Sequence, residues 1–238
     1  MPRSPAKKIA PASAAGSLSR EKIVETALAL ISENGLDGFS LRDVARALGV
    51  YPTAIYWYVK SKNALLGEVC AAMLATVLPA RGSGSWQDWI RLLCRRYRKA
   101  MKQHPNLAQL VGARLLSNSS LDVDLIERVL QVLEEAGCPP ERIVELYNTV
   151  IAAMCGFVTL EFAPLPSEGA EAWSDELAQR VHGISALRHP TLARHLPALA
   201  NNSFILRWQS GHQRPLERSF ETYLDVVVAG LERELAAC

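Results

Sequence analysis

The feature that most constrains the fold of this chain is the segment from Ser40 to Lys62, which has the pattern of two short helices joined by a glycine turn. Ser40 can cap the first helix, and Asp43 three residues later favours its positive end. Gly49 can adopt the positive φ that ends this helix, and Pro52 is well placed as the first residue of the next one. The pattern therefore predicts a helix-turn-helix, a unit that reads DNA.

The second helix of this unit, Pro52 to Tyr58, has an unusual composition. Ile55 can point inward, whereas hydroxyl-bearing and aromatic residues surround it. Such side chains on a short helix can contact phosphates, sugars and thymine methyl groups. A competing interpretation, in which Tyr56 and Trp57 pack the core of a small domain, stays open at this point.

A third helix precedes the unit, because Ser19 can cap a helix that runs to about Asn34 and that Gly35 ends.

Charge is also uneven along the chain. Residues 1–62 carry nine Lys and Arg against five Asp and Glu, a net charge of +4, and the remainder carries 17 against 19, a net charge of −2. The basic charge therefore lies with the predicted DNA-reading unit.

The run ALALISENGLDGFSLRDVARALGVYPTAIYWYVKSKNALL resembles the DNA-binding domain of the tetracycline-repressor (TetR) family of bacterial regulators. Within the family it is most similar to the tetracycline repressors themselves, because YWYVKSKNALL carries Trp57. The resemblance continues more weakly through SWQDWIRLLCRRYRKAM. It implies a helix-turn-helix DNA-binding domain over residues 19–62 and a larger helical domain for ligand binding and dimerisation over residues 63–238.

The resemblance also implies which residues contact DNA. Ser40 and Arg42 would touch the backbone or a base edge, and Lys62 would grip a phosphate. Tyr51 and Pro52 stand where the tetracycline repressors have a polar pair that reads bases, so we expect a different operator sequence. The full set of expected DNA contacts is Ser40, Arg42, Tyr51, Pro52, Thr53, Ala54, Tyr56, Trp57, Tyr58 and Lys62.

From Ser61 onward the chain has the pattern of successive helices, without an alternating strand pattern, so we expect an all-α fold. Ala163 to Trp173 is expected to be a mobile loop, and Asn201 to Pro215 an irregular region. The basic run at Arg95 to Lys99 is expected to form a solvated surface with Asp or Glu partners. Helices are expected over about 61–78, 85–101, 121–136, 140–162 and 216–235.

Two of these helices, one containing Ile143 to Val158 and the other Phe220 to Leu231, carry more apolar surface than a single core requires. Both can simply be central helices of an all-α body. The resemblance favours another role, since members of the family pack such helices into a four-helix bundle with a partner chain. A two-fold homodimer reads a palindrome whose half-sites lie about 34–36 Å apart.

In similar proteins a small molecule enters the larger domain and shifts the helix equivalent to residues 61–78, which releases the operator. Val111 stands where the tetracycline repressors have a metal-binding His, so a tetracycline–magnesium inducer is not expected. The candidates for effector contact, which can also be plain core, suggest an apolar or aromatic compound. They are Trp86, Trp89, Ile90, Leu93, Tyr97, Leu107, Leu110, Val111, Leu115, Tyr147, Ile151 and Met154.

No enzyme or cofactor is expected, because the chain has no GxSxG motif, P-loop, dinucleotide glycine pattern or metal triad. The five cysteines lie far apart without a CxxC pair, so a zinc site is not expected. His182, His189 and His195 match no metal-ligand spacing, and the segment RHPTLARHLP that holds two of them is expected to be surface or loop.

Residues 1–18 are basic, lack acidic residues and are rich in Pro, Ala and Ser, so they are expected to form a disordered tail. No segment has the uncharged apolar length of a signal peptide or membrane span, which predicts a cytoplasmic protein. The alternative function is that of a helical protein that sequesters a small molecule without specific DNA binding. Salt-sensitive binding to a specific DNA sequence distinguishes the two.

Overall fold

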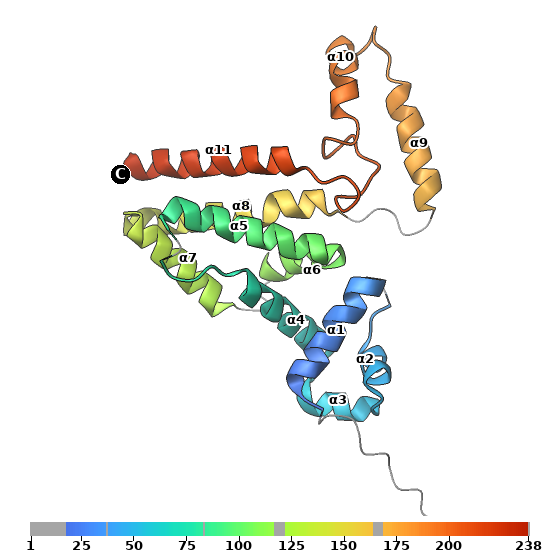
Figure 1. The fold of residues 1–238 in the computed structure, drawn as a ribbon, viewed down its shortest axis with the longest axis vertical. Helices are drawn as coiled ribbons and strands as arrows, with labels where there is room; N and C mark the ends of the chain where they lie inside the picture. The colour runs from blue at the N-terminus through green and yellow to red at the C-terminus, as the bar shows by residue number, and fades with distance from the viewer. Residues whose placement is uncertain (1–17, 37, 83, 117–121, 164–168, 238) are drawn as a thin grey trace, which may run out of the picture.

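The computed structural model describes residues 18–36, 38–82, 84–116, 122–163 and 169–237 (Figure 1). All ordered elements within these ranges are helical, which confirms the all-α class. Residues 1–17, predicted to be a tail, lie outside them. The helices are α1 (Arg20–Asn34), α2 (Leu41–Leu48), α3 (Pro52–Tyr58), α4 (Lys62–Val77), α5 (Trp86–Gln103), α6 (Pro105–Leu116), α7 (Val123–Glu135), α8 (Ile143–Glu161), α9 (Ala170–His182), α10 (Pro190–Leu199) and α11 (Glu217–Ala236), with a 3-10 turn at Pro140–Arg142 before α8.

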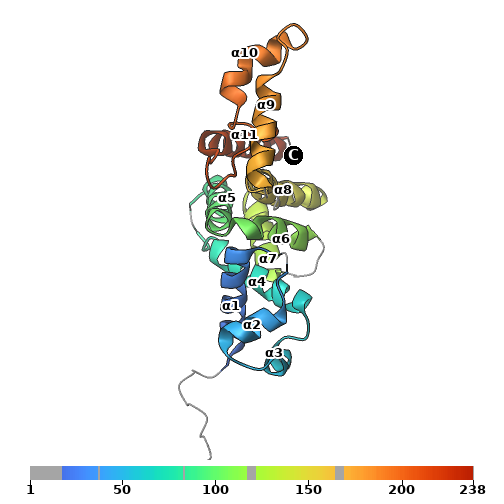
Figure 2. The ribbon, with the colours of Figure 1, turned by 90° about the vertical axis from the view of Figure 1, so that its right-hand side faces the viewer.

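The small domain at one end of the molecule consists of α1, α2 and α3 (Figures 1 and 2). Ser19 caps α1 by accepting a hydrogen bond from the Lys22 amide, as predicted. The domain buries Ile23 and Ile31 of α1 against Val44 of α2, all fully removed from solvent. Helix α4 begins at the Ser61 cap, packs against α1 and continues into contact with α5 and α6, so it joins the small domain to the rest.

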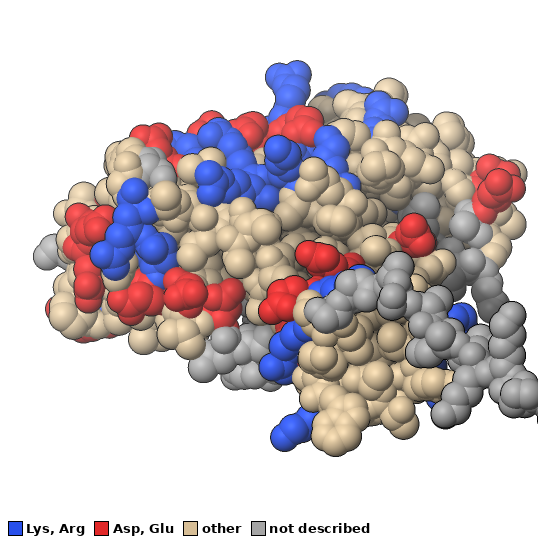
Figure 3. All heavy atoms as spheres, turned by 60° about the horizontal axis from the view of Figure 1, so that its bottom comes forward, with Lys and Arg blue, Asp and Glu red and all other residues tan. Residues whose placement is uncertain are grey.

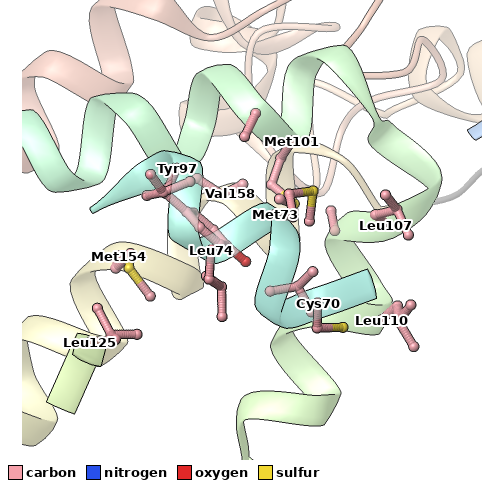
Figure 4. Packing of buried hydrophobic residues seen from close by; sticks show 14 of the residues in the cluster. Cys70, Met73, Leu74, Tyr97, Met101, Leu107, Leu110, Leu125, Met154 and Val158 are labelled. Atoms are coloured by element: carbon pink, nitrogen blue, oxygen red, sulfur yellow. The ribbon is translucent and has the colours of Figure 1, made fainter. Parts of the chain in front are cut away.

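The larger domain is built around α8, which packs against α5, α6, α7 and α11. Figure 4 shows part of its core, where Leu74 of α4, Tyr97 of α5 and Met154 of α8 meet. The interior is apolar, since most of these side chains are less than 5% exposed. Burial of such side chains is the main stabilising contribution to folding, at roughly 1.5–3 kcal/mol for each large one.

The segment Pro140–Glu161, which contains α8, is long and apolar enough to cross a membrane by length and composition, with a mean hydropathy of 1.7. A third of its most apolar window is buried inside the chain. A single helix of this kind is weak evidence for a membrane span, because the core helix of a globular protein passes the same test. Its remaining apolar surface is better explained by helix packing, as argued below.

Helices α9 and α10 form a hairpin that projects away from α8 and α11 (Figure 1). This corrects two expectations. The segment RHPTLARHLP is helical, because α10 spans Pro190–Leu199, although it is surface as predicted and buries none of its residues. The predicted loop from Ala163 to Trp173 is too long, because α9 begins at Ala170; residues 164–168 lie outside the described ranges.

Arg95 of α5 pairs with an acidic residue of α11 at the surface, as predicted, but the prediction of a solvated run is wrong for Arg98, which is buried. Arg95 Nη2 lies 2.6 Å from Glu221 Oε2, and Arg91 Nη2 lies 3.4 Å from Asp225 Oδ1. Figure 3 shows basic and acidic side chains interleaved over the larger domain. This surface is therefore locally neutralised and is a poor second site for nucleic acid.

Candidate DNA-binding and effector sites

The helix-turn-helix has the predicted geometry. At the start of α2, the Ser40 amide donates to Asp43 Oδ2 at 3.0 Å and the Ser40 hydroxyl donates to the same oxygen at 2.6 Å. These hydrogen bonds lower the pKa of Asp43, so it stays ionised at the positive end of the helix. Gly49 ends α2 in the left-handed conformation, at φ 66° and ψ 28°, and Pro52 opens α3.

Helix α3 attaches to the small domain through one apolar contact line and leaves its aromatic residues in solvent. Ile55 and Val59 are fully buried, whereas Tyr51 is 84% exposed and Trp57 is 88% exposed. Tyr56 is 53% exposed. The interpretation of Tyr56 and Trp57 as core residues is therefore wrong, and these rings project outward from α3.

Tyr58 differs from the other aromatic residues of α3. Its hydroxyl donates a hydrogen bond to the Leu18 carbonyl at 2.7 Å, so it ties the residue that precedes α1 to the end of α3. The side chain is 37% exposed. Tyr58 therefore has a positioning role inside the protein, in addition to any contact with DNA. The sequence does not predict this role, because the partner is a backbone atom 40 residues away.

A shallow depression of about 530 Å³ lies where the starts of α2 and α4 meet, beside α3. It brings together the predicted residues Ser40, Arg42 and Lys62. It also includes Lys60, a cation that sequence reasoning did not single out, and no acidic residue lines it. Lys62 Nζ lies 5.6 Å from the centre of the Phe39 ring, a cation–π contact that leaves the ammonium group exposed. The lining residues are Ser40, Leu41, Arg42, Tyr56, Lys60, Ser61 and Lys62.

The remaining predicted DNA residues lie at or near the N-terminus of α3. Thr53 is exposed, whereas Pro52 and Ala54 are half-buried. Figure 3 shows an uncharged tip on the small domain with basic side chains around its edge. An aromatic helix flanked by cations matches the needs of duplex DNA, where phosphates take the charges and base edges take the polar and apolar contacts.

The predicted effector residues are brought together mainly as a closed core. Ile90, Leu93, Tyr97, Leu107, Val111 and Met154 are fully buried, and Leu110 is 7% exposed. Tyr147 and Ile151 of α8 are half-buried at its surface. The side chain of Leu115 lies outside the described residues. Trp86 and Trp89 separate from this group and line a small cavity between α5 and α7.

Tyr97 stands out within this core because its hydroxyl has no strong hydrogen-bond partner among the described residues. Its ring extends from α5 towards Leu74 of α4 (Figure 4). Burial raises the pKa of Tyr97 well above its usual value, and the neighbouring Cys155 thiol adds to the rise. The Cys155 thiol beside it is a weak acceptor, so the Tyr97 hydroxyl lacks a strong hydrogen-bond partner inside an apolar domain.

The buried cysteines around Tyr97 are unreactive in this state. Burial raises the pKa of Cys94 to about 12 and that of Cys155 to about 11. A thiol needs its thiolate form to react, so neither is a nucleophile near neutral pH. Among the described residues, no group of three or more His, Cys, Asp or Glu is arranged to hold a metal ion.

Sequence reasoning also missed a buried ion pair that holds three helices together. Arg98 of α5 donates to Glu161 at the end of α8 through Nε at 2.7 Å and Nη2 at 2.8 Å. The Leu216 amide, which precedes α11, donates to Glu161 Oε1 at 2.7 Å. Arg98 also pairs with Glu217 of α11. The chain offers no sequence signal for this cluster, since its members lie up to 119 residues apart.

Comparison with known proteins matches both parts of the chain. The family model of bacterial regulatory proteins, tetR family, matches residues 23–69, and that of the tetracyclin repressor-like, C-terminal domain matches residues 78–235. Tetracycline repressor protein class C of Escherichia coli is 26% identical over 222 residues, which cover 91% of each chain.

The class D tetracycline repressor of Escherichia coli is 34% identical over 125 residues. These cover 50% of the chain and 56% of that protein, so the match spans little more than half of that relative's length. Among solved structures, the Streptomyces coelicolor TetR family protein ActR in complex with (S)-DNPA matches with a TM-score of 0.68 and 22% identity, over 92% of this chain and all of the other. This likeness establishes the shared fold.

Proposed function

The chain belongs to the TetR family of bacterial regulatory proteins, and on this premise we propose that it is a transcriptional repressor that binds a palindromic DNA operator as a homodimer. A small apolar or aromatic effector that enters the larger domain releases the operator. The place of action is the cytoplasm, where bacterial DNA lies. No enzymatic step is part of this function.

The observation that carries the DNA-binding role is the outward-facing aromatic surface of α3 beside a depression lined by cations. Trp57 is 88% exposed and Tyr51 is 84% exposed, an unfavourable arrangement for side chains without a partner. Arg42, Lys60 and Lys62 line the neighbouring depression without an acidic residue. The alternative function, sequestration of a small molecule, gives no reason for this combination.

The proposed dimer surface consists of the exposed faces of α8 and α11. Gly156 and Gly230 lie inside these helices, and a Cβ atom at either position would meet no atom within 4 Å. Glycine inside a helix costs about 1 kcal/mol relative to alanine, so two glycines without a packing role in the monomer need another explanation. Close approach of a partner helix supplies it. Val144 and Leu160 on α8 and Val226 on α11 add exposed apolar surface.

The proposed effector site centres on Tyr97, whose hydroxyl has no strong acceptor in the closed core, only the Cys155 thiol beside it. An apolar or aromatic compound that also carries one hydrogen-bond acceptor would satisfy this donor. The same core includes Leu74 of α4, the helix that reaches back to the small domain. A ligand that binds only when this core opens would therefore favour a different position of α4, and only such differential affinity can shift the equilibrium.

The test of this function is binding of the purified protein to the intergenic DNA upstream of its own gene, with scrambled DNA as competitor and a salt titration. We expect specific binding that one or more members of a panel of aromatic compounds release. Arg42→Ala and Lys62→Ala should each weaken binding to all sequences and reduce the slope of log affinity against log salt by about 1, because each removes one phosphate contact.

Arg194→Ala, at an exposed position on α10, is the matched control and should leave both affinity and slope unchanged. Thr53→Ala should instead change operator preference, because a lost base contact costs about 1–3 kcal/mol at that position only. If the protein without any compound binds the whole upstream region no more strongly than scrambled DNA, the sequestering alternative is favoured.

A further inference from the structure

A small cavity between α5 and α7, at the connection from α4 to α5, contains two buried donors that have no acceptor among the described residues. It has a volume of about 40 Å³. It is distinct from the closed core around Tyr97, which lies two helical turns further along α5. Its lining residues are Arg81, Gly82, Gly84, Ser85, Trp86, Trp89, Arg128, Gln131, Val132 and Glu135.

The first donor is the indole N–H of Trp89. The side chain is 3% exposed, and no described residue accepts a hydrogen bond from Nε1. A buried polar group is almost always paired, since an unmet donor costs about as much as a lost hydrogen bond. The indole nitrogen can only donate, so whatever occupies its partner position must carry an acceptor atom.

The second donor is Arg128 of α7, whose Nη1 is buried and has no hydrogen-bond partner in the described part of the chain. The structure gives Arg128 no ion pair with any described residue. A guanidinium group that is partly removed from water and not neutralised favours an anion, above all one that can accept two parallel hydrogen bonds.

The lining of the cavity carries a second cation. Arg81 lines the cavity and is held there by a hydrogen bond of 2.7 Å from its Nη2 to Gln131 Oε1. Ser85 and Trp86 place the start of α5 against the cavity, where the Asp88 carboxylate accepts hydrogen bonds from the Ser85 amide and hydroxyl, so the helix end itself is already capped. Glu135 is the only acidic residue in the lining, and it is exposed to solvent.

We propose that this cavity binds the carboxylate group of a small organic acid, with Trp89 Nε1 and Arg128 Nη1 as donors to its oxygens. The size agrees with this assignment, because a carboxylate group has a volume similar to that of one water molecule, roughly 30 Å³, and the cavity has about 40 Å³. The remainder of the acid extends through the open side of the cavity. This site does not depend on DNA binding or on the effector core.

The test follows the indole N–H signal of Trp89 by NMR in the full chain labelled with 15N-tryptophan, at constant ionic strength. Trp89→Phe identifies the signal among the five tryptophans. We expect sodium acetate to move this signal saturably, and acetamide, its neutral counterpart of the same shape, to leave it in place. Arg128→Gln should weaken acetate binding about ten-fold or more, whereas Arg194→Gln on α10 should not change it.

Arg128→Lys keeps the charge without the planar pair of donors, so it should bind acetate with intermediate affinity, and it tests the site if the glutamine variant does not fold. An unmoved Trp89 signal would overturn the proposal and leave water as the occupant. The proposal would also be overturned if the Trp89 signal responded equally to acetate and acetamide, or if Arg128→Gln and Arg128→Lys both bound acetate with the affinity of the parent protein. Because the readout uses the protein without DNA, failure here is distinguishable from failure of the proposed function.

Discussion

At the scale of single residues, the Tyr97 hydroxyl is expected to affect stability and effector binding in opposite directions. The ring of Tyr97 is fully buried, but its hydroxyl has only the weak acceptor Cys155 beside it in an apolar core. Tyr97→Phe removes only that hydroxyl. We expect the free energy of unfolding to rise by about 1 kcal/mol, because a weakly paired buried polar group disappears, while affinity for the releasing compound falls.

Denaturant unfolding at fixed protein concentration and titration with the releasing compound would measure the two effects. Tyr223→Phe, at a half-buried tyrosine of α11 outside the candidate effector residues, is the control and should change neither by as much. A less stable Tyr97→Phe variant would mean that the hydroxyl already has a strong partner, and unchanged affinity for the compound would remove Tyr97 from the effector site.

Gly211 illustrates a residue fixed by close approach. A Cβ atom there would lie 2.3 Å from the Glu161 carbonyl oxygen. Because this oxygen belongs to the backbone, a change of side-chain rotamer cannot relieve the clash. We expect Gly211→Ala to lower the free energy of unfolding by about 1–3 kcal/mol. The loop before α11 must shift to make room for the new Cβ atom, and this shift would disturb the contacts of Glu161.

The matched control for this variant is Gly183→Ala at the end of α9, where a Cβ atom would lie at an ordinary 3.4 Å from its nearest neighbour. Thermal unfolding of the two variants beside the parent protein would compare them. Equal melting temperatures for all three would show that the loop before α11 has room to adjust.

At the scale of elements, the sequence predicts α1 to α5 closely, because each start has a serine or proline signal. Ser19, Ser40, Ser61 and Ser85 all occupy N-cap positions, and Pro52 opens α3. Such signals are local, so they need no knowledge of the tertiary structure.

Helix α10 escaped prediction for the opposite reason. Leu192, Leu196 and Leu199 lie at helical spacing, but Pro197 interrupts the run and none of the residues of α10 is fully buried, so the pattern differs from that of a core helix. The paired donors Trp89 and Arg128 escaped for a related reason, because only the packing of α5 against α7 brings them to one cavity. The motif places the predicted DNA-contact residues on one surface, but the role of Tyr58 as donor to Leu18 depends on the fold.

The exposed glycine of α8 gives a prediction for this helix as a packing surface. Gly156→Leu adds a side chain where the monomer has free space, and it should improve helix propensity by nearly 1 kcal/mol. If a partner helix packs there, the same change should disrupt the dimer. Sedimentation velocity should then show a monomer that remains fully helical by circular dichroism.

Ala75→Leu, at an exposed position of α4, serves as the control for this substitution and should remain dimeric. A dimeric Gly156→Leu protein would place the interface elsewhere, and the glycine would then have no packing role in the assembly.

At the scale of the whole molecule, the arrangement of domains determines how an operator can be read. The small domain lies at one end of the chain and the α8 and α11 faces lie at the side of the larger domain, with α4 between them (Figures 1 and 2). The short α3 helix, seven residues long, reaches only a few base pairs. Specificity therefore requires two copies, held at one separation by the proposed dimer surface.

That separation is testable on the DNA itself. Two α3 helices related by a two-fold axis meet the same face of the duplex when the half-sites lie about one turn apart, roughly 34–36 Å. Inserting five base pairs at the centre of the operator turns one half-site to the opposite face, so we expect affinity to fall to that of an isolated half-site. Inserting ten base pairs restores the face but adds a full turn of length. Affinity should stay low there as well, because α8 and α11 fix the distance, and electrophoretic mobility shifts would compare the three operators. Recovery with ten base pairs would instead mean that the two small domains move independently of the dimer core.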